Sequence, residues 1–153
     1  MMGGGQQQLQ QLSQELQALD EEIEALNEEI EEYREEQSDI DDAVEAIETL
    51  ETGDTVQVPL GGGAYVRAEV QDIDEIVVSL GGDYAVEQDQ SGAVDALRAK
   101  QDALDDRIEE TQAEISELEA ESDQLEQQAQ QMQQQMQQQQ MQQMQQQADE
   151  TDE

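Results

Sequence analysis

Three consecutive glycines, Gly61 to Gly63, come closest in this chain to a chemical motif, because glycine-rich loops cradle phosphates. A phosphate loop must continue into Gly-Lys-Ser or Gly-Lys-Thr, and a dinucleotide fold needs G-x-G-x-x-G at the start of a helix. Here the glycines continue into AYVRAEV, whose apolar and polar residues alternate as in a β-strand. The glycines therefore predict a turn between strands, without a nucleotide or another cofactor.

Two groups of closely spaced acids have a composition that suits calcium: Asp39 with Asp41 and Asp42, and Asp72 with Asp74. Neither group lies in a twelve-residue EF-hand loop with its central glycine and final glutamate. The sequence has no cysteine and no histidine, which excludes thiol and imidazole catalysis and the usual zinc ligands. We interpret the acids as solvated surface, and we expect no catalytic residue, no metal site and no enzyme activity.

The chain is strongly acidic, with 41 Asp and Glu against 5 Lys and Arg among 153 residues and a net charge of -36. Because phosphate recognition depends on basic side chains, neither nucleic acid nor an anionic membrane is an expected partner. Like charges at this density repel one another, and molar salt would screen them beyond about 3 Å. The composition favours a halophilic protein; the alternatives are a mesophile's acidic coiled coil and a disordered acidic segment.

The sequence carries no pattern for membrane insertion or secretion. No apolar run approaches the roughly 18 to 20 residues that cross a bilayer. The start, MMGGGQQQ, lacks the basic and apolar regions of a signal peptide. We therefore expect a soluble, cytoplasmic protein.

Residues 1–52 predict an N-terminal coiled-coil helix, because apolar residues recur at spacings of three and four from Leu9 onward until Gly53 ends the repeat. Residues 92–147 predict a second coiled-coil helix, with Ser91 as a candidate N-cap. The end of this helix is a run of glutamine interrupted by methionine. The acidic residues 148–153 are expected to form a disordered tail.

Residues 53–91 predict two β-hairpins. Alternating residues flank the first glycine turn, and EIVVSL and DYAVEQ flank a second turn assigned to Gly81 and Gly82. Four strands this short cannot bury a core, so other chains are expected to complete them into a barrel-like body in an oligomer. The predicted fold class is α+β: a long antiparallel helical coiled coil with two β-hairpins at its connecting end.

Charge favours one register for the two helices. If facing residue numbers sum to about 141, three pairs of opposite charge meet: Asp41 with Arg98, Glu36 with Arg107, and Arg34 with Asp105. A slide of one heptad instead brings like charges together. In the favoured register the second helix outruns the first from about Met136. We call the heptad positions that face the partner helix the seam. Its polar residues either fix the register or loosen the pairing; they are Gln37, Gln101, Thr111 and Ser122.

The order of two helices and two hairpins resembles that of the alpha-class subunits of the archaeal prefoldin family. The resemblance includes the segment from Val58 to Asp89, VPLGGGAYVRAEVQDIDEIVVSLGGDYAVEQD. The acidity resembles that of a haloarchaeal member. The resemblance implies a hetero-hexamer of two alpha and four beta subunits, with a β-barrel body and six coiled-coil tentacles. It also implies a molecular chaperone that holds unfolded client proteins at the tentacle tips without nucleotide and passes them to a group II chaperonin.

Carried over by position, the resemblance assigns two surfaces to this chain. The client-binding surface would lie at the distal helix ends and include Met1, Met2, Leu9, Leu12, Met132, Met136, Met141 and Met144. The assembly surface would lie on the hairpins and include Val56, Val58, Val66, Val70, Ile76, Val78 and Val86. The alternative function is a structural coiled-coil scaffold or tether without client binding, which has little need of two hairpins.

Overall fold

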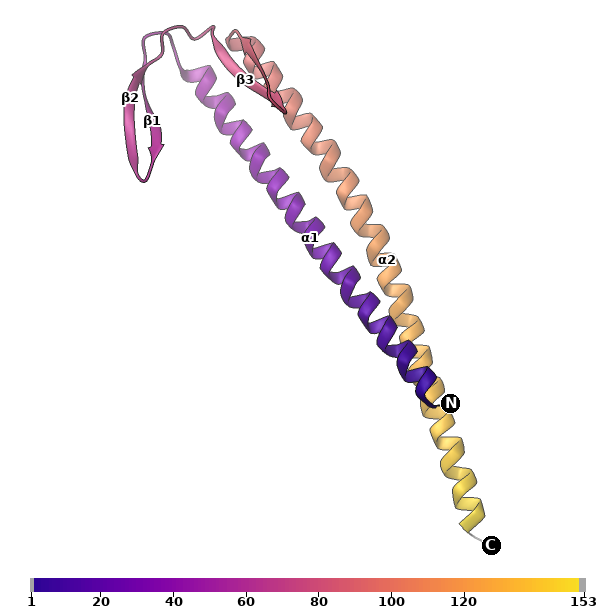
Figure 1. The fold of residues 1–153 in the computed structure, drawn as a ribbon. Helices are drawn as coiled ribbons and strands as arrows, with labels where there is room; N and C mark the ends of the chain where they lie inside the picture. Colours follow the sequence, from indigo (N-terminus) through magenta and orange to yellow (C-terminus); the bar gives the residue numbers. More distant parts are fainter. Residues whose placement is uncertain (1, 152–153) are drawn as a thin grey trace. The chain divides into compact units, whose positions relative to one another are not determined.

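The computed structural model describes the backbone of residues 2–151 and the side chains of residues 4–150. The elements follow in the order α1 (Met2–Thr49), β1 (Thr55–Gly61), β2 (Ala64–Glu69), β3 (Ile76–Gly81), β4 (Tyr84–Gln88) and α2 (Gln90–Thr151) (Figure 1). Two long helices thus flank two short hairpins, which confirms the predicted fold class. The described chain contains no closed barrel, because each hairpin is a separate two-stranded sheet.

The chain divides into two compact units. We call Glu31–Glu109 the hairpin unit, and Met1–Ile30 together with Glu110–Glu153 the terminal unit. Each unit contains one segment of α1 and one segment of α2. All five basic residues of the sequence fall in the hairpin unit: Arg34, Arg67, Arg98, Lys100 and Arg107.

The predicted seam positions are the covered positions of both helices. In the hairpin unit, a buried cluster is packed by partly buried neighbours on both helices: Ile40, Val44 and Leu104, with Tyr33, Val94 and Leu97 around them. In the terminal unit, Ile30 and Ile115 are buried, and α1 residues at the same spacing down to Leu9 are half-buried. Covered residues at spacings of three and four are the mark of paired amphipathic helices, so the heptad prediction is confirmed.

The two hairpins repeat the same pairing twenty residues apart. Val58 pairs with Val66 in the first hairpin, and Val78 pairs with Val86 in the second. Each register shifts just before the turn, between Pro59 and Gly61 and between Ser79 and Gly81. A bulge therefore precedes both turns, at Leu60 and at Leu80, which are themselves equivalent in the sequence.

Positive backbone angles explain the turn glycines. Gly62 and Gly63 form the first turn with φ of 61° and 83°, values that L side chains adopt at a steric cost. The second turn is Gly82–Asp83, so the sequence assignment of Gly81–Gly82 is wrong by one residue. Gly81 belongs to β3 and has a φ of 103°. The displacement arises because the bulge consumes one residue before the turn begins.

Hydrogen bonds from the connecting segment fix the neighbouring ends of the helices. The first residue of α2, Gln90, donates through Nε2 to the carbonyl of Ile47 at 2.6 Å, near the end of α1. Asp89 caps α2, since its Oδ1 accepts from the Gly92 amide at 2.7 Å. The N-cap is therefore Asp89 and not Ser91, whose hydroxyl lies 3.4 Å from the same Asp89 oxygen.

The C-terminal helix is longer than the sequence indicated. α2 continues through residues 148–151, which we had assigned to a disordered tail, while residues 152–153 lie outside the described residues. The glutamine run and the alanine that follows it are good helix formers, and neither glycine nor proline interrupts them. The helix accordingly has no local reason to end at residue 147.

Candidate functional site

Exposed large apolar side chains gather on the hairpins of this acidic chain. Seven such residues lie on the strands: Val58, Leu60, Tyr65, Val66, Val77, Leu80 and Tyr84. Their exposures run from 40% at Val58 to 80% at Tyr84. Exposed apolar groups in such number are uncommon on soluble monomers, so we take the hairpins as a candidate interaction surface.

Five of these seven residues were absent from the predicted assembly surface: Leu60, Tyr65, Val77, Leu80 and Tyr84. Leu60, Leu80 and Tyr84 lie on the predicted apolar rows but were not included in the predicted surface. Tyr65 and Val77 lie on the opposite rows, which the prediction treated as solvated. A lone two-stranded hairpin leaves both rows uncovered, and the adjacent valines of EIVVSL were the signal that both rows carry apolar groups.

The two hairpins differ in how the chain covers them, despite their equivalent sequences. Val58 and Val66 are 40% and 46% exposed, whereas their counterpart Val78 is 5% exposed and Val86 is half-buried. The remaining predicted assembly residues, Val56, Val70 and Ile76, are half-buried. The first hairpin therefore presents its paired valines to solvent, while the second has covered the equivalent pair within the chain.

Lys100, the single lysine of the sequence, anchors the second hairpin to α2. Its ammonium group donates to the backbone carbonyl of Ser79 at 2.8 Å. Figure 1 shows the β3–β4 hairpin beside the first turns of α2, where Ala93 is fully buried. The ammonium group satisfies a carbonyl next to Val78 and so holds β3, the strand that carries Val78, at α2.

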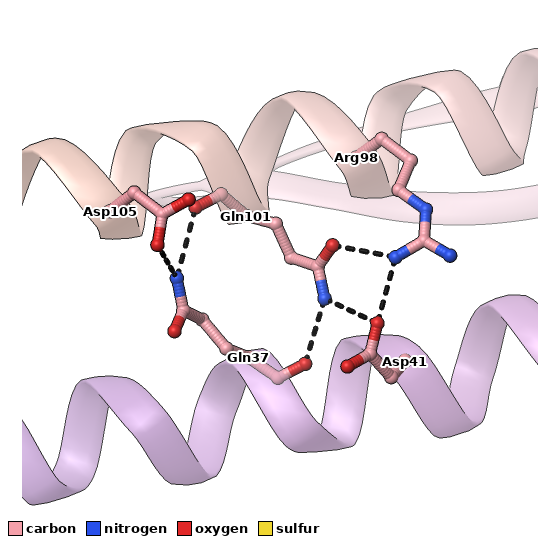
Figure 2. A network of polar contacts seen from close by, with 5 residues as sticks. All are labelled: Gln37, Asp41, Arg98, Gln101 and Asp105. Carbon is pink, nitrogen blue, oxygen red and sulfur yellow. Dashed lines mark hydrogen bonds and ion pairs between the residues drawn. The ribbon is translucent and has the colours of Figure 1, made fainter.

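A polar network joins the helices within the hairpin unit (Figure 2). Gln37 Nε2 donates to the backbone carbonyl of Gln101 at 3.2 Å, and Gln101 Nε2 donates to the backbone carbonyl of Gln37 at 2.9 Å. The exchange is reciprocal, so it is satisfied only when these two residues face each other. Asp105 Oδ1 accepts from Gln37 at 2.6 Å, and Arg98 bonds to both Asp41 and Gln101 at 2.7 Å.

The network selects between the two registers considered from the sequence. The Asp41–Arg98 ion pair forms at 2.7 Å, as predicted for facing numbers that sum to about 141. In the terminal unit, a Cβ atom at Gly5 would lie 3.4 Å from the sulfur of Met136, which follows the same numbering. Arg107, expected beside Glu36, lies over the ring of Tyr33 at 6.0 Å from its centroid. The favoured register therefore holds in each unit.

The pKa of Asp41 lies below its ordinary value of 3.8, first because Gln101 donates a hydrogen bond to its carboxylate and then because Arg98 does. The charge of Arg98 lowers the pKa further, while partial desolvation opposes the shift. Since the folded state holds the ionised form, the stability that this group contributes is present above its ordinary pKa. That contribution is lost as the pH falls through the lowered value.

We expect Gln101→Ala to raise the pKa of Asp41 toward the ordinary value, because it removes the hydrogen bond that lowers that pKa most. An NMR titration of the Asp41 carboxyl carbon measures the change. Arg67→Ala, in β2 and outside the network, is the control and should leave the Asp41 titration unmoved. An unchanged midpoint in Gln101→Ala would contradict the assignment.

The predicted client-binding residues lie in the terminal unit, in two classes. Leu9, Leu12, Met132 and Met136 are half-buried, and an open groove of about 360 Å³ lies between the helices beside Leu12 and Met132. The other lining residues are Gln8, Gln11, Glu15, Gln128, Gln131 and Gln135. Met141 and Met144 are 71% and 73% exposed. Met1 lies outside the described residues, as does the side chain of Met2.

Within the terminal unit, α2 continues beyond the N-terminal end of α1 (Figure 1). The exposed overhang begins after Met136, slightly later than predicted, because Met136 packs beside Gly5. Every described side chain from residue 137 to residue 150 is exposed. No acidic or basic side chain occurs in residues 1–14 or 127–148, so the first turns of α1 and a long stretch of α2 before Asp149 lack charged side chains in an otherwise strongly acidic chain.

Among the acids considered as calcium ligands, Asp41 belongs to the polar network and Asp72 accepts a local hydrogen bond. Asp72 Oδ1 accepts from the Asp74 amide at 3.0 Å, in the turn between the hairpins. Among the described side chains, no group of three or more carboxylates is close enough to hold a metal ion. Neither helix, over its described length, has a segment apolar enough to traverse a lipid bilayer.

Comparison with known proteins identifies the family. A family model described as prefoldin subunit matches residues 14–151. The chain is 80% identical over 112 residues to prefoldin subunit alpha of Halorubrum lacusprofundi, across 73% of this chain and 74% of that protein. It is 74% identical over 106 residues to prefoldin subunit alpha of Haloquadratum walsbyi, across 69% of each protein. The resemblance to haloarchaeal alpha subunits is thereby confirmed.

A solved structure supports the same conclusion. The filamentous PFD of Methanocaldococcus jannaschii, determined by cryo-EM, is 26% identical, with a TM-score of 0.51. The match covers 76% of this chain and 93% of that chain. From its family match, its relatives and its helix, hairpin, hairpin, helix order, the chain belongs to the prefoldin family and is a prefoldin-type chaperone subunit.

Proposed function

We propose that this chain is the alpha subunit of a hetero-hexameric, nucleotide-independent holdase with two alpha and four beta subunits. The hexamer captures unfolded proteins at the ends of its coiled coils and delivers them to a group II chaperonin in the cytoplasm. The observation that carries the proposal is the separation of exposed large apolar side chains into two places, the hairpins and the methionine overhang.

The hairpins support the assembly part of the proposal. Each is a two-stranded sheet, which is marginal in water, and each exposes a strand edge together with apolar side chains. Strands from beta subunits would pair with these edges and cover Val58, Val66 and their exposed neighbours. A tether would gain nothing from such a surface, so the hairpins favour a subunit of an assembly over a scaffold.

The two stretches without charged side chains, residues 1–14 and 127–148, support the capture part of the proposal. An unfolded client offers apolar side chains, and Met141 and Met144 offer flexible, polarizable ones in return. The adjacent groove beside Leu12 and Met132 gives a partly apolar surface on the same unit. Carboxylates would have to be desolvated on contact with an apolar client, and these two stretches carry none.

A truncation tests capture directly. The chain ended at Met132, mixed with a haloarchaeal beta subunit in molar KCl, should still form a hexamer but lose most of its protection of guanidinium-unfolded citrate synthase. Light scattering on dilution of the client measures protection, and light-scattering mass measurement after size exclusion measures assembly. The reason is that the cut removes Met136, Met141 and Met144 while the hairpins stay intact.

A chain ended at Gln147 is the matched control, since it removes only residues 148–153, of which four are acidic, and should protect fully. Failure to form a hexamer with the uncut chain would overturn the assembly proposal. Full protection by the chain ended at Met132 would overturn the capture proposal and leave the scaffold function in its place.

A further inference from the structure

Methionine has a restricted distribution in this chain. All six methionines lie in residues 1–2 and 132–144, and none occurs between them. The apolar seam over the intervening residues is built from Leu, Ile, Val and Ala, with one Tyr. The sequence has no cysteine, so thioether sulfur is its only readily oxidised sulfur. Oxidisable sulfur is therefore confined to the two ends of the chain.

The four described methionines differ in access to solvent. Met132 and Met136 are half-buried, and a Cβ atom at Gly5 would lie 3.4 Å from the Met136 sulfur. Met141 and Met144 are 71% and 73% exposed, on a stretch of α2 where every described neighbour is exposed. Oxidation of methionine follows exposure of the sulfur. The outer pair should thus react before the inner pair.

We propose that Met141 and Met144 form an oxidation site that switches off client capture, an inference that rests on the proposed holdase function. A peroxide transfers one oxygen atom to each thioether: the sulfur is oxidised by two electrons to a sulfoxide, the O–O bond breaks, and hydrogen peroxide leaves as water. No change in the backbone is required. The reaction is reversible, because a thiol-dependent reductase returns the sulfoxide to the thioether.

The residues around Met141 and Met144 make oxidation a large loss of apolar surface. Residues 137–147 contain only glutamine and the two methionines, so these thioethers are the only apolar side chains of the overhang before Ala148. A sulfoxide is polar and accepts hydrogen bonds, much as a glutamine amide does. Oxidation of two residues therefore converts the whole stretch into a polar surface, which has no apolar group left to bind a client.

The site itself is tested by mass spectrometry on the isolated full chain in molar KCl with hydrogen peroxide. Cleavage after Glu126 and Glu150 releases one peptide that contains all four methionines, and fragmentation then locates each added oxygen. We expect Met141 and Met144 to oxidise several-fold faster than Met132 and Met136. Equal rates at all four positions would overturn the proposed site.

The switch is tested by protection after the fast pair alone has been oxidised, the peroxide removed and untreated beta subunit added. Oxidised wild type should lose several-fold of its protection of citrate synthase. The double variant Met141→Leu/Met144→Leu is compared with itself: whatever its protection before treatment, the same peroxide should not reduce that protection, because leucine is not oxidised. Met141→Gln/Met144→Gln should be weak from the start, since glutamine imitates the polarity of the sulfoxide.

The outcomes separate this inference from the function on which it rests. If untreated wild type does not protect, or protects equally when ended at Met132, the proposed holdase function fails. If untreated wild type protects through its overhang but oxidised wild type protects as well, only the switch fails. An equal loss of protection in the leucine variant would also overturn the switch, because it would place the sensitive group elsewhere.

Discussion

Val58→Asp should abolish assembly with beta subunits while leaving the isolated chain folded, whereas Val78→Asp should unfold the isolated chain. The two residues occupy equivalent positions of the two hairpins, each opposite a valine of the next strand. Their exposures are 40% and 5%. The pair of substitutions therefore makes the same chemical change at the same place in the motif, in two different environments.

The expected sizes follow from those environments. At Val58 the new carboxylate stays in water, so the free energy of unfolding should change by no more than about 0.5 kcal/mol, as at other surface sites. At Val78 the carboxylate would be buried without a partner, and such an uncompensated charge costs about 3 to 5 kcal/mol. For assembly, the substitution at Val58 should have the large effect, because Val58 is the side chain that a partner strand would cover.

Guanidinium unfolding of the isolated chain in molar KCl measures the free energy of unfolding. The mass of the mixture with beta subunit measures assembly. Gln57→Asp is the matched control, because it adds the same charge beside Val58 on the other row of β1. We expect it to leave the hexamer intact. A hexamer formed by Val58→Asp, or a stable isolated Val78→Asp, would show that the two hairpins are not divided in this way.

Replacing both glutamines of the reciprocal pair, by Gln37→Leu with Gln101→Leu, should raise stability and weaken register. Two leucines in the seam of the hairpin unit would gain apolar burial, with about 1.5 to 3 kcal/mol for each side chain if fully covered. Of the five hydrogen bonds lost, the three to Asp105, Asp41 and Arg98 are exposed to solvent and contribute little. The two reciprocal bonds contribute about 0.5 to 1.5 kcal/mol each to stability. The net change should be stabilising, as for buried polar seam residues that specify register at a cost in stability.

Weakened register should appear as a second distance between spin labels on the two helices. Glu31 and Asp95 are both exposed and lie well apart along the seam, and a chain without cysteine allows clean labelling at Glu31→Cys and Asp95→Cys. A slide of one heptad moves one helix by about 10 Å along the other. Wild type should give a single narrow distance, and the leucine variant should add a second one.

The single variant Gln37→Ala provides the control for this pair, since it removes hydrogen bonds without adding a large apolar group. It should lower the thermal midpoint, in contrast to the leucine pair. If the Gln37→Leu/Gln101→Leu variant gives only the wild-type distance between the spin labels, the hairpin connection alone holds the register. A leucine pair less stable than wild type would show that the hydrogen bonds outweigh apolar burial here.

Features set by local periodicity and backbone geometry were predictable from the sequence. The spacing from Leu9 to Ile47 predicts a helix seam whatever lies opposite, and the glycines at 61–63 and 81–82 fit turns that require positive φ. The Asp41–Arg98 pair was predictable because few cations are available and their positions restrict the register. The seam and the turns depend only on residues close together in the chain, and the ion pair depends only on the sign of the charges.

Features set by contacts between distant residues were not predictable. Whether Gln37 and Gln101 fix or loosen the seam depends on amide orientation at the distance between the helices, and the sequence left that open. The hairpins share their paired valines and turn glycines, yet Val78 is buried while Val58 is exposed, and Lys100 bonds only to the second hairpin. The cap was misplaced by two residues because both Asp89 and Ser91 are suitable capping types.

The placement of the five basic residues decides how much each unit depends on dissolved cations to neutralise its acidic side chains. The hairpin unit contains its own counter-charges in Arg34, Arg67, Arg98, Lys100 and Arg107, whereas the terminal unit has acidic side chains and no basic one. Because that unit has no basic side chain of its own, cations from solution must offset most of its carboxylate charge. Dissolved salt therefore stabilises the acidic stretches of the two helices in the terminal unit, residues 15–30 and 110–126, which should separate as the salt concentration falls.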